Sequence, residues 1–485
     1  MNVLNVCVLY VKIIHRLTER CLKTYLIEFS IIMSLFNLFS AHLSADEMVR
    51  DNDKIVALLL DRRERYTSCA DIVLSPNSTQ SVQKIMQLAW ANKIPVVPIG
   101  GNTGLCGGAT INGGVLLSLE KLNQINPVNT ADRCITVGSG CLLYQVQQAA
   151  KDAGLFFPLS LASEGSCQIG GNIAANAGGI NVLRYGTMRD LVLGLEVVLP
   201  NGEMISSLQP LHKNTAGLDL KHLFIGSEGT LGVITAATLK LFLLPQQVET
   251  LWADCQTIDD CINLLNLLQK NSLGSLKSFE LISHAALMVS ANDLRTTPPT
   301  NAAWHILCEW EKTPHTDRLP ETLLQHGFEH IFIAQNDTQR QNWWRLRENI
   351  SAAQKRRGVS IKHDIALPIF ALADFVQQCD TALKNAFPSA EIVLFGHLGD
   401  GSLHYNIFLP DYPDKTAYQF ENQLNSIVYQ AVLQHNGTIA AEHGVGMLKK
   451  NWLKNMRNAS ELALMQAIKQ YLDPDNIMNP TKVYP

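Results

Sequence analysis

The sequence predicts an α+β protein of at least two domains, on three observations. The chain has 485 residues, which is more than one hydrophobic core usually serves. Its 47% hydrophobic and 17% charged residues are typical of a folded globular protein. Short strand patterns alternate with helical patterns as far as about Leu244, and longer helical patterns follow.

The elements of the first half follow one another closely. Apolar residues recur at helical spacing from Glu47 to Arg62, and a strand-like segment follows at 71–76. We then expect a helix over 81–92 and a strand over 94–98. Many glycines separate the later elements, which is typical of an α/β or α+β domain.

The second half begins after the segment 245–249, Pro-Gln-Gln-Val-Glu, which is the best linker candidate. Its helical patterns are longer, and short strands lie between them, so we expect a second α+β domain. The expected helices cover 258–269, 339–355, 418–435 and 460–471.

Charge and cysteine content exclude several functions. The net charge of -4 offers no basic field for binding nucleic acid. The eleven cysteines form no Cys-x-x-Cys pair, so neither a zinc ribbon nor a cysteine-ligated iron–sulfur cluster is indicated. Scattered thiols are typical of a reducing compartment. We therefore expect a cytoplasmic protein, either free or peripheral at the inner face of the membrane.

Residues 1–45 form an N-terminal extension in this interpretation. The stretch Tyr25–Leu43 is largely apolar, Glu28 is its only formal charge, and cations precede it. This pattern resembles a signal-peptide core or a marginal membrane span, although a charge inside a span is costly. The alternative is that translation starts at Met33 and residues 1–32 are not native.

Two glycine-rich runs mark the first half, at 98–108 and 164–179. Without Cβ atoms, consecutive backbone N–H groups can converge on an anion or lie flat against a ring system. Such a lining suits a pyrophosphate and a large planar heterocycle. One run alone is equally well explained by tight turns, but a third run at 226–232 favours binding. The neutral side chains that add donors are Asn102, Thr103, Ser166, Asn172 and Asn176.

A dinucleotide-binding Rossmann site is the rival interpretation. The segment 135–140, Ile-Thr-Val-Gly-Ser-Gly, follows a strand pattern and opens a helix, but Leu143 occupies the place of the third glycine. No stretch fits the Walker A pattern. NAD and ATP are therefore poor candidates.

The second half carries a group of histidines. His397 and His404 flank the sequence Gly-Asp-Gly-Ser, whose glycines favour a hairpin turn over a helix. The two histidines would then lie on adjacent strands, with Asn406 on the same face as His404. Glu442 and His443 follow later in the chain. Two imidazoles and one carboxylate suit a divalent metal with a position open for substrate, although paired histidines in a hairpin are more often structural.

A cluster of cationic residues precedes these histidines. Arg347 and Ser351 are four residues apart, so one helix would place them on one face. Lys362 follows in a short strand pattern. Most of this cluster is explained by a solvated helix face.

The glycine runs, together with the segments 184–202 and 223–235, resemble the FAD domain of flavoproteins of the vanillyl-alcohol-oxidase (PCMH) type. The branch resembled is that of the D-2-hydroxyglutarate and D-lactate dehydrogenases. The resemblance implies a PCMH-type FAD-binding domain of two α+β subdomains over 46–245. It also implies an α+β substrate (cap) domain over 246–485, whose tail at 472–485 returns to the flavin.

The resemblance implies which residues contact FAD. Residues 100–104 would hold the pyrophosphate, and the second glycine run would line the flavin. Some relatives tether FAD through a histidine before the first run, but no histidine lies in 98–108, so we expect non-covalent FAD. The expected contacts are Pro98, Gly100, Gly101, Asn102, Thr103, Gly104, Ser166, Gly170, Gly171, Asn172, Asn176, Gly178, Val233, Ile234 and Asn479.

The resemblance also assigns roles in the second half. His397, His404 and Glu442 match the family's ligands to a divalent metal, expected to be zinc. His443 matches its proposed proton acceptor. A serine replaces the usual threonine at one substrate position and keeps the hydroxyl. The residues that match substrate contacts are Arg347, Ser351, Lys362, Asn406 and His443.

The implied reaction oxidises a small D-2-hydroxy acid, such as D-2-hydroxyglutarate, D-malate or D-lactate, to the 2-oxo acid. The metal would lower the pKa of the substrate hydroxyl, His443 would take its proton, and a hydride would pass to flavin N5. Electrons would then leave to a separate acceptor, which could be a quinone, an electron-transfer protein or dioxygen. Homodimer formation is left open.

Two rival functions make different predictions. A non-catalytic flavin-binding subunit of a larger glycolate or lactate oxidase complex would have lost the metal and substrate residues, yet all are present. A metal-free alcohol oxidase would leave His397, His404 and Glu442 unexplained.

Overall fold

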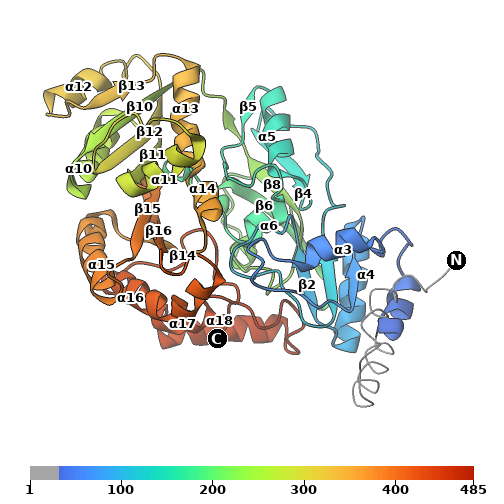
Figure 1. Cartoon of the computed structure of the whole chain (residues 1–485). Coiled ribbons are helices and arrows are strands. Elements are labelled where there is room, and N and C mark those ends of the chain that lie inside the picture. The colour runs from blue at the N-terminus through green and yellow to red at the C-terminus, as the bar shows by residue number, and fades with distance from the viewer. Residues whose placement is uncertain (1–31) are drawn as a thin grey trace.

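The computed structural model describes residues 32–485 and consists of two α+β halves (Figure 1). The N-terminal half extends to β9 (Phe242–Leu243), and the C-terminal half starts at β10 (Val248–Cys255). The linker candidate 245–249 lies at this junction. The expected α+β fold class is therefore confirmed.

A small parallel sheet forms the first unit of the N-terminal half. Its three strands, β1 (Ile72–Leu74), β2 (Val96–Ile99) and β3 (Val115–Ser118), run in the order β1-β3-β2. Helix α4 (Thr79–Asn92) connects β1 to β2 and packs its apolar face on the sheet. Helix α3 (Asn52–Leu59) precedes these elements.

The helix that we expected over 47–62 is shorter in the structure. It starts at Asn52 because the side chain of Asp51 caps the N–H groups of Asp53 and Lys54. Before this cap, Met48 pairs with the end of β1 as an isolated bridge, so the segment is extended rather than helical.

An antiparallel sheet forms the second unit of the N-terminal half, in the order β4-β8-β6-β7. Apolar side chains of helix α5 (Leu143–Asp152) and helix α6 (Ile169–Ala174) pack against this sheet and form its core. The segment 135–140 is the expected strand-to-helix turn, between β4 and α5. The strands are β4 (Cys134–Gly138), β6 (Val192–Val198), β7 (Met204–Ser207) and β8 (Val233–Lys240), and β5 (Leu155–Phe156) pairs with β9 beside them.

Residues 32–40 are helical and belong to the packed structure. Leu35, Phe39 and Leu43 are buried against α4 and the parallel sheet. The apolar stretch expected over 25–43 therefore ends in the core, and its part before residue 32 lies outside the described residues. Every helix within 32–485 is too short or too polar to cross a bilayer.

A seven-stranded sheet forms the centre of the C-terminal half, in the order β13-β10-β12-β11-β15-β16-β14. All pairings in this sheet are antiparallel. The strands that follow β10 are β11 (Leu276–Ser283), β12 (Trp304–Glu311), β13 (Ile331–Ile333), β14 (Ser360–Ala366), β15 (Glu391–His397) and β16 (Ser402–Phe408).

Helices cover the two faces of this sheet differently. One face is buried along its length by α10 (Ile258–Asn271), α12 (Leu319–Gln325), α15 (Leu372–Ala386) and α16 (Glu421–Gln434). The other face is covered only in part, by α11 (His284–Leu294), α13 (Asp337–Glu348) and α14 (Ile350–Arg357). The rest of that face carries polar side chains.

The expected helix over 339–355 is divided, because α13 ends and α14 begins around Asn349. The side-chain amide of Asn349 donates to Asp293 on α11, which ties the junction to its neighbour. The other helices expected in this half are present as α10, α16 and α18 (Ala459–Leu472).

The chain returns to the N-terminal half at its end. After α17 (Lys450–Met456), helix α18 (Ala459–Leu472) runs beneath both halves (Figure 1). Its Lys469 donates to the carbonyl oxygens of Thr230 and Met478. Met478 pairs with Val96 of β2, so the tail lies against the parallel sheet.

Candidate active site

The β15–β16 hairpin places the two predicted metal histidines on one face of the seven-stranded sheet. His404 lies opposite Phe395 of β15 and Asp364 of β14, and His397 ends β15 opposite Ser402. Side chains alternate between faces along a strand, so His404 and Asn406 share a face. The expected hairpin is confirmed. Residues on the alternate positions, such as Tyr405, are buried in the core on the opposite face.

The predicted ligand set converges on one point. Nε2 of His397 lies 3.2 Å from Oε1 of Glu442, and Nε2 of His404 lies 4.0 Å from its Oε2. One ligand atom from each of the three side chains falls within 4.8 Å of the others. Two imidazole nitrogens and a carboxylate at this spacing are the donor set that zinc accepts in catalytic sites.

Glu280 of β11 orients the first histidine, and the sequence interpretation missed it. The buried carboxylate accepts from Nδ1 of His397 at 2.7 Å, which leaves Nε2 to face Glu442. Its other oxygen accepts from Nε of Arg347 at 2.9 Å, and Nη2 of Arg347 lies 2.6 Å away. Burial raises the pKa of Glu280, but His397 and Arg347 outweigh it and hold that pKa below its usual value. Such partners fix the tautomer and the direction of a ligating histidine.

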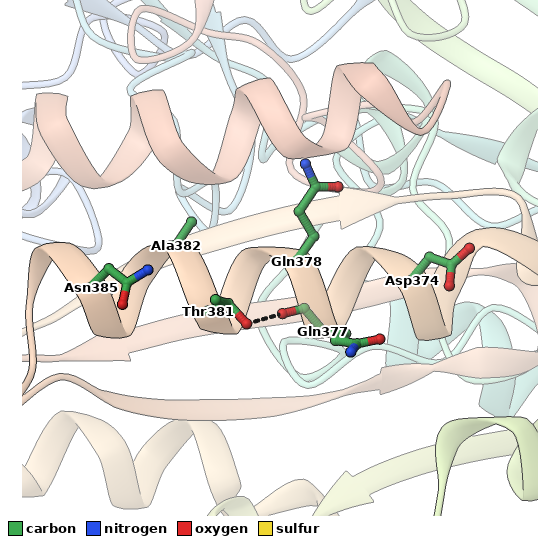
Figure 2. A pocket seen from close by; sticks show the side chains of 6 residues that line it. All are labelled: Asp374, Gln377, Gln378, Thr381, Ala382 and Asn385. Carbon is green, nitrogen blue, oxygen red and sulfur yellow. Dashed lines mark hydrogen bonds between the residues drawn. The ribbon is translucent and has the colours of Figure 1, made fainter.

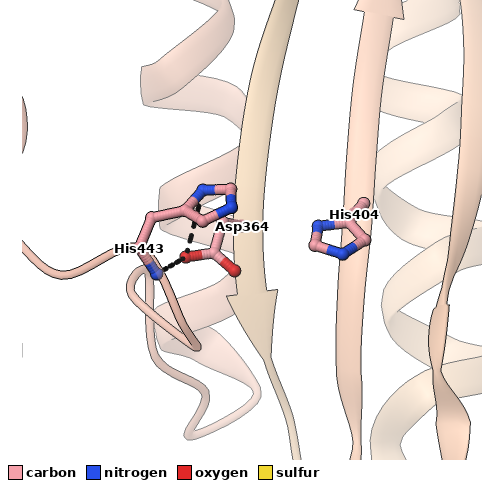
Figure 3. A group of neighbouring side chains, drawn as sticks. All are labelled: Asp364, His404 and His443. Carbon is pink, nitrogen blue, oxygen red and sulfur yellow. Dashed lines mark hydrogen bonds and ion pairs between the residues drawn. The ribbon is translucent and has the colours of Figure 1, made fainter. Parts of the chain in front are cut away.

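Asp364 of β14 holds the predicted proton acceptor (Figure 3). It accepts the backbone N–H of His443 at 2.8 Å, and Nδ1 of that ring lies 3.6 Å from the same oxygen. Burial lowers the pKa of His443, although Asp364 opposes this, and Lys449 lowers it further. A histidine whose pKa is depressed is neutral at pH 7, as a proton acceptor must be.

Asp364, His404 and His443 form a second group that could hold a cation, and His404 is common to both groups. The carboxylate of Asp364, however, already accepts the N–H groups of Glu442 and His443, and Nζ of Lys449 lies 3.5 Å away. These three donors compete with any cation for its lone pairs. The geometry therefore favours the group with Glu442 as the metal site and leaves Asp364 to orient His443.

The three residues of the first group differ in their electrostatics. Burial lowers the pKa of His404 to about 4, so its imidazole is a neutral donor. Burial raises the pKa of Glu442, but the two histidines outweigh it and bring the pKa to about 2, so its carboxylate is ionised. Metal ligands must be deprotonated, as these two are. His397 differs: burial lowers its pKa, but Glu280 and Glu442 outweigh it and hold that pKa well above its usual value, so metal binding would have to displace a proton from its ring.

Four of the five predicted substrate residues are linked to this group by strand pairing or hydrogen bonds, and Ser351 is the exception. Lys362 of β14 stands opposite Asn406 of β16, on the face that carries the histidines. Burial, with Arg63 and Lys355 nearby, lowers the pKa of Lys362 to about 8. Arg347 is buried beside Glu280, whereas Ser351 is exposed on α14.

The first two glycine runs lie in direct contact, although they are more than fifty residues apart in sequence. A Cβ on Gly101 would lie 1.9 Å from the carbonyl oxygen of Ser166, so only glycine permits this approach. A Cβ added to Gly104 or Gly171 would meet no atom within 4 Å. The backbone is therefore tightly packed at Gly101 but open at Gly104 and Gly171. Such an arrangement leaves room for a large ligand beside the glycine runs, and we call this region the FAD cradle.

Several buried polar atoms near these runs have no hydrogen-bond partner among residues 32–485, and two of them are amide oxygens that could accept from a ligand. These two oxygens are Oε1 of Gln168 and Oδ1 of Asn479. Nδ2 of Asn479 donates to the carbonyl oxygens of Gly108 and Glu228, which fixes the direction of its free oxygen. Unpaired buried acceptors need a partner, and N–H groups of a bound FAD would supply it.

The remaining predicted flavin contacts are placed in different ways. The side-chain amide of Asn102 donates to the carbonyl oxygen of Leu60, and the side-chain oxygen of Asn176 accepts the backbone N–H of Arg189. Both side chains therefore make hydrogen bonds within the protein. Pro98, Gly100 and Thr103 are half-buried, Ser166 is exposed, and Gly170, Asn172, Val233 and Ile234 are buried.

The cradle and the metal group meet at Gly178. A Cβ on this glycine would lie 3.7 Å from Oε1 of Glu442. The second glycine run, from the N-terminal half, therefore touches a predicted metal ligand from the C-terminal half. This contact brings a predicted flavin-lining segment and a predicted metal ligand to one place.

Another surface hollow lies far from this chemistry. Six side chains of helix α15 line it, and its one internal hydrogen bond joins Thr381 to the carbonyl oxygen of Gln377 (Figure 2). All six residues come from one exposed helix face and include no histidine, so we assign it no function. They are Asp374, Gln377, Gln378, Thr381, Ala382 and Asn385.

Known families match both halves of the chain. Residues 70–207 match a family described as an FAD binding domain, and residues 244–483 match the C-terminal domain of FAD linked oxidases. Among solved structures, p-cresol methylhydroxylase covers 94% of this chain and 96% of its own at a TM-score of 0.74 and 15% identity. The 4-ethylphenol oxidase of Gulosibacter chungangensis gives a TM-score of 0.71, with 94% of this chain and 98% of its own covered, also at 15% identity. These likenesses confirm the PCMH-type fold.

Closer relatives are similar over nearly their whole length. A D-2-hydroxyglutarate dehydrogenase of Stutzerimonas stutzeri (strain A1501) is 37% identical over 90% of this chain and 96% of its own. The mitochondrial D-2-hydroxyglutarate dehydrogenase of Arabidopsis thaliana is 33% identical over 92% and 81%. A mitochondrial protein of Schizosaccharomyces pombe, named for D-lactate dehydrogenase, is 32% identical over 88% and 84%. The chain therefore belongs to the FAD-dependent D-2-hydroxy-acid dehydrogenases, the family of these D-2-hydroxyglutarate and D-lactate enzymes.

Proposed function

We propose that this chain oxidises a D-2-hydroxy diacid, D-2-hydroxyglutarate or D-malate, with non-covalent FAD and a divalent metal, for which zinc is the best candidate. The observation that carries the proposal is the convergence of His397, His404 and Glu442 beside Gly178. The cation Lys362 stands on the same sheet face. The names of the relatives at 33–37% identity support the diacid over the monoacid.

The bound cofactors would supply two kinds of chemistry. FAD accepts a hydride from the carbon that bears the hydroxyl. A divalent metal lowers the pKa of an oxygen that binds to it, so a substrate hydroxyl can lose its proton near neutral pH. His397, His404 and Glu442 would hold the metal, and the cradle around Gly101 would hold FAD.

The chain's own residues would manage the proton and the orientation of the substrate. Neutral His443, directed by Asp364, would take the hydroxyl proton. Lys362 and Asn406 would bind a substrate carboxylate from neighbouring strands. Nε and Nη2 of Arg347 contact Glu280, which leaves Nη1 to donate a hydrogen bond to a substrate carboxylate. Together these contacts would fix the reacting carbon against the flavin.

Reduced flavin must then pass its electrons on. The cysteines among residues 32–485 are free and scattered, and most of them are buried, so they offer no cluster of their own. We infer a separate electron acceptor, either a quinone or an electron-transfer protein.

An initial-rate panel tests the proposal directly. Purified protein would be assayed with D-2-hydroxyglutarate, D-malate and D-lactate and an artificial electron acceptor, before and after removal of metal by a chelator. We expect the diacids to give the highest kcat/KM and the chelated protein to be inactive with its flavin spectrum unchanged. Added zinc should restore the rate. Full activity in protein shown to be metal-free would refute the metal role, and a preference for D-lactate would refute the diacid.

A further inference from the structure

Two carboxylates, buried Asp364 and half-buried Glu228, hold the loop 442–449, which we call the ligand loop. Its first two backbone N–H groups donate to Asp364, at 3.1 and 2.8 Å. The N–H groups of Val445 and Gly446 donate to the two oxygens of Glu228, at 2.7 and 2.8 Å. Each carboxylate thus grips two consecutive peptide groups. Between them they fix the backbone on both sides of the proposed base.

The two carboxylates come from different halves of the protein. Asp364 belongs to β14 of the C-terminal sheet, whereas Glu228 lies in the third glycine run of the N-terminal half. A Cβ on Gly108, in the first glycine run, would lie 3.5 Å from Oε2 of Glu228. Glu228 therefore connects the backbone of the FAD cradle with the ligand loop.

Glu228 is itself held in a demanding conformation. Its φ is +51°, in the left-handed region that non-glycine residues seldom adopt. Its carbonyl oxygen accepts from Nδ2 of Asn479 at 2.7 Å, which helps to hold this backbone in place. Backbone strain of this kind persists only where the surroundings impose it, and it is often found at functional sites.

The carboxylate of Glu228 makes side-chain hydrogen bonds to the ligand loop and to no other part of residues 32–485. No lysine, arginine or histidine nitrogen within residues 32–485 lies within 4.0 Å of it, and its hydrogen bonds all go to Val445 and Gly446. Removing a carboxylate from water without a cation beside it is costly, and the two peptide N–H groups of the ligand loop offset part of that cost. Lys449, the nearest buried cation, donates instead to the carbonyl oxygen of Ile439.

We propose that Glu228 is a positioning residue that ties the FAD cradle to the ligand loop and so sets the place of Glu442 and His443. It would act through the backbone and would touch neither substrate nor metal. The proposal rests on the proposed function only for the roles of those two residues. Loss of the tie should loosen the loop, weaken metal binding and lower kcat, while the FAD site and the fold remain.

The test uses the FAD-loaded full chain with three substitutions. Glu228→Gln keeps the shape but replaces one acceptor oxygen with an NH₂ group that faces a donor. Glu228→Asp keeps both acceptors on a shorter side chain. Glu196→Gln is the matched control, because Glu196 accepts from Thr79 and Thr235 and is remote from the loop.

Four quantities would be measured on each protein: FAD content, melting temperature, zinc retained against a competing chelator, and amide exchange of peptides over 440–450. For Glu228→Gln we expect wild-type FAD content, roughly ten-fold faster exchange confined to 440–450, and roughly ten-fold weaker zinc binding. Glu228→Asp should recover part of both losses. Glu196→Gln should match the wild type.

The outcomes separate this proposal from the proposed function. Unchanged exchange over 440–450 in folded, FAD-loaded Glu228→Gln would overturn it. So would a loss of FAD and protection throughout the chain, which would mark Glu228 as a general structural residue. If Glu228→Gln cannot be recovered, Glu228→Asp decides by the same readouts. A wild-type protein that binds no zinc would refute the metal site, yet the exchange measurement would still decide the role of Glu228.

Discussion

Replacement of Lys362 offers the cleanest test of what the substrate site binds. Arg347 is a poorer probe, because its removal would also leave buried Glu280 without its cation and disturb His397. Lys362 makes no ion pair with the described residues 32–485. Lys362→Met should therefore remove a substrate contact and little else.

The magnitude follows from the burial of the ammonium group. Its pKa falls from the ordinary 10.5 to about 8, so holding the charge in place costs about 3 kcal/mol relative to water. A bound carboxylate can recover much of this, and a charge-assisted hydrogen bond contributes on the order of 1.5–3 kcal/mol. Lys362→Met should thus lower kcat/KM for a diacid by roughly ten- to hundred-fold.

The same pKa predicts how activity depends on pH. A lysine with a depressed pKa is charged below that pKa and loses its charge as pH rises through it. The charged share should fall from about nine-tenths at pH 7 to about one-tenth at pH 9, so kcat/KM for the diacid should fall roughly ten-fold. Lys362→Arg keeps its charge over this range and should give a flat profile.

The assay compares pH profiles of kcat/KM for D-2-hydroxyglutarate and D-lactate in the wild type and both variants. If Lys362 binds the distal carboxylate, only the diacid should lose rate between pH 7 and 9. If D-lactate falls equally, the lysine grips the carboxylate beside the reacting carbon, and the site has no cation that selects a diacid in this way. A wild-type diacid profile that stays flat would refute the contact altogether.

Three further predictions concern the metal, the N-terminus and the flavin. Glu280→Gln should weaken metal binding roughly ten- to hundred-fold and lower the free energy of unfolding by about 3 kcal/mol, because buried Arg347 loses its partner. Elemental analysis and thermal unfolding check this, and wild-type values in both would contradict it. A chain that starts at Met33 should bind FAD normally. A chain that starts at Asp46 lacks the three buried apolar side chains of 35–43, so its free energy of unfolding should fall by about 5 kcal/mol. Equal yields of FAD-loaded protein from the two chains would argue against this. Acid precipitation should release all FAD into the supernatant, and a yellow pellet would show a covalent link.

Features that depend on local sequence could be predicted. The hairpin between His397 and His404 follows from glycines that break a helix and from the two-residue period of a strand. The helices with a clear apolar period also formed, with ends within a few residues of the expected ones. The helix start at Asn52 was missed because a cap at Asp51 decided it, rather than the apolar spacing.

Residues that depend on strand pairing could not be predicted in the same way. Glu280 meets His397 because β11 pairs with β15, more than a hundred residues later, and one sequence does not reveal that register. Asp364 is two residues beyond Lys362 in the same strand, but its partners lie almost eighty residues away. A usable signal existed in both cases. Glu280 lies between Phe279 and Leu281, Asp364 precedes Ile365 in a strand pattern, and a charge buried in a strand needs a specific partner.

The partners of four carboxylates in this region bear on the place of the proposed cation. Glu280 has Arg347 and an imidazole, Asp364 has two peptide N–H groups with Lys449 nearby, and Glu228 has two peptide N–H groups. Glu442 differs, because its oxygens face only the imidazoles of His397 and His404 among residues 32–485. Nδ1 of His397 is committed to Glu280, so its other nitrogen points at the same place. Burial lowers the pKa of His397, but Glu280 and Glu442 outweigh it and hold that pKa well above its usual value, so a proton on His397 supplies the positive charge that Glu442 faces. A divalent cation bound by the three side chains would take the place of that proton.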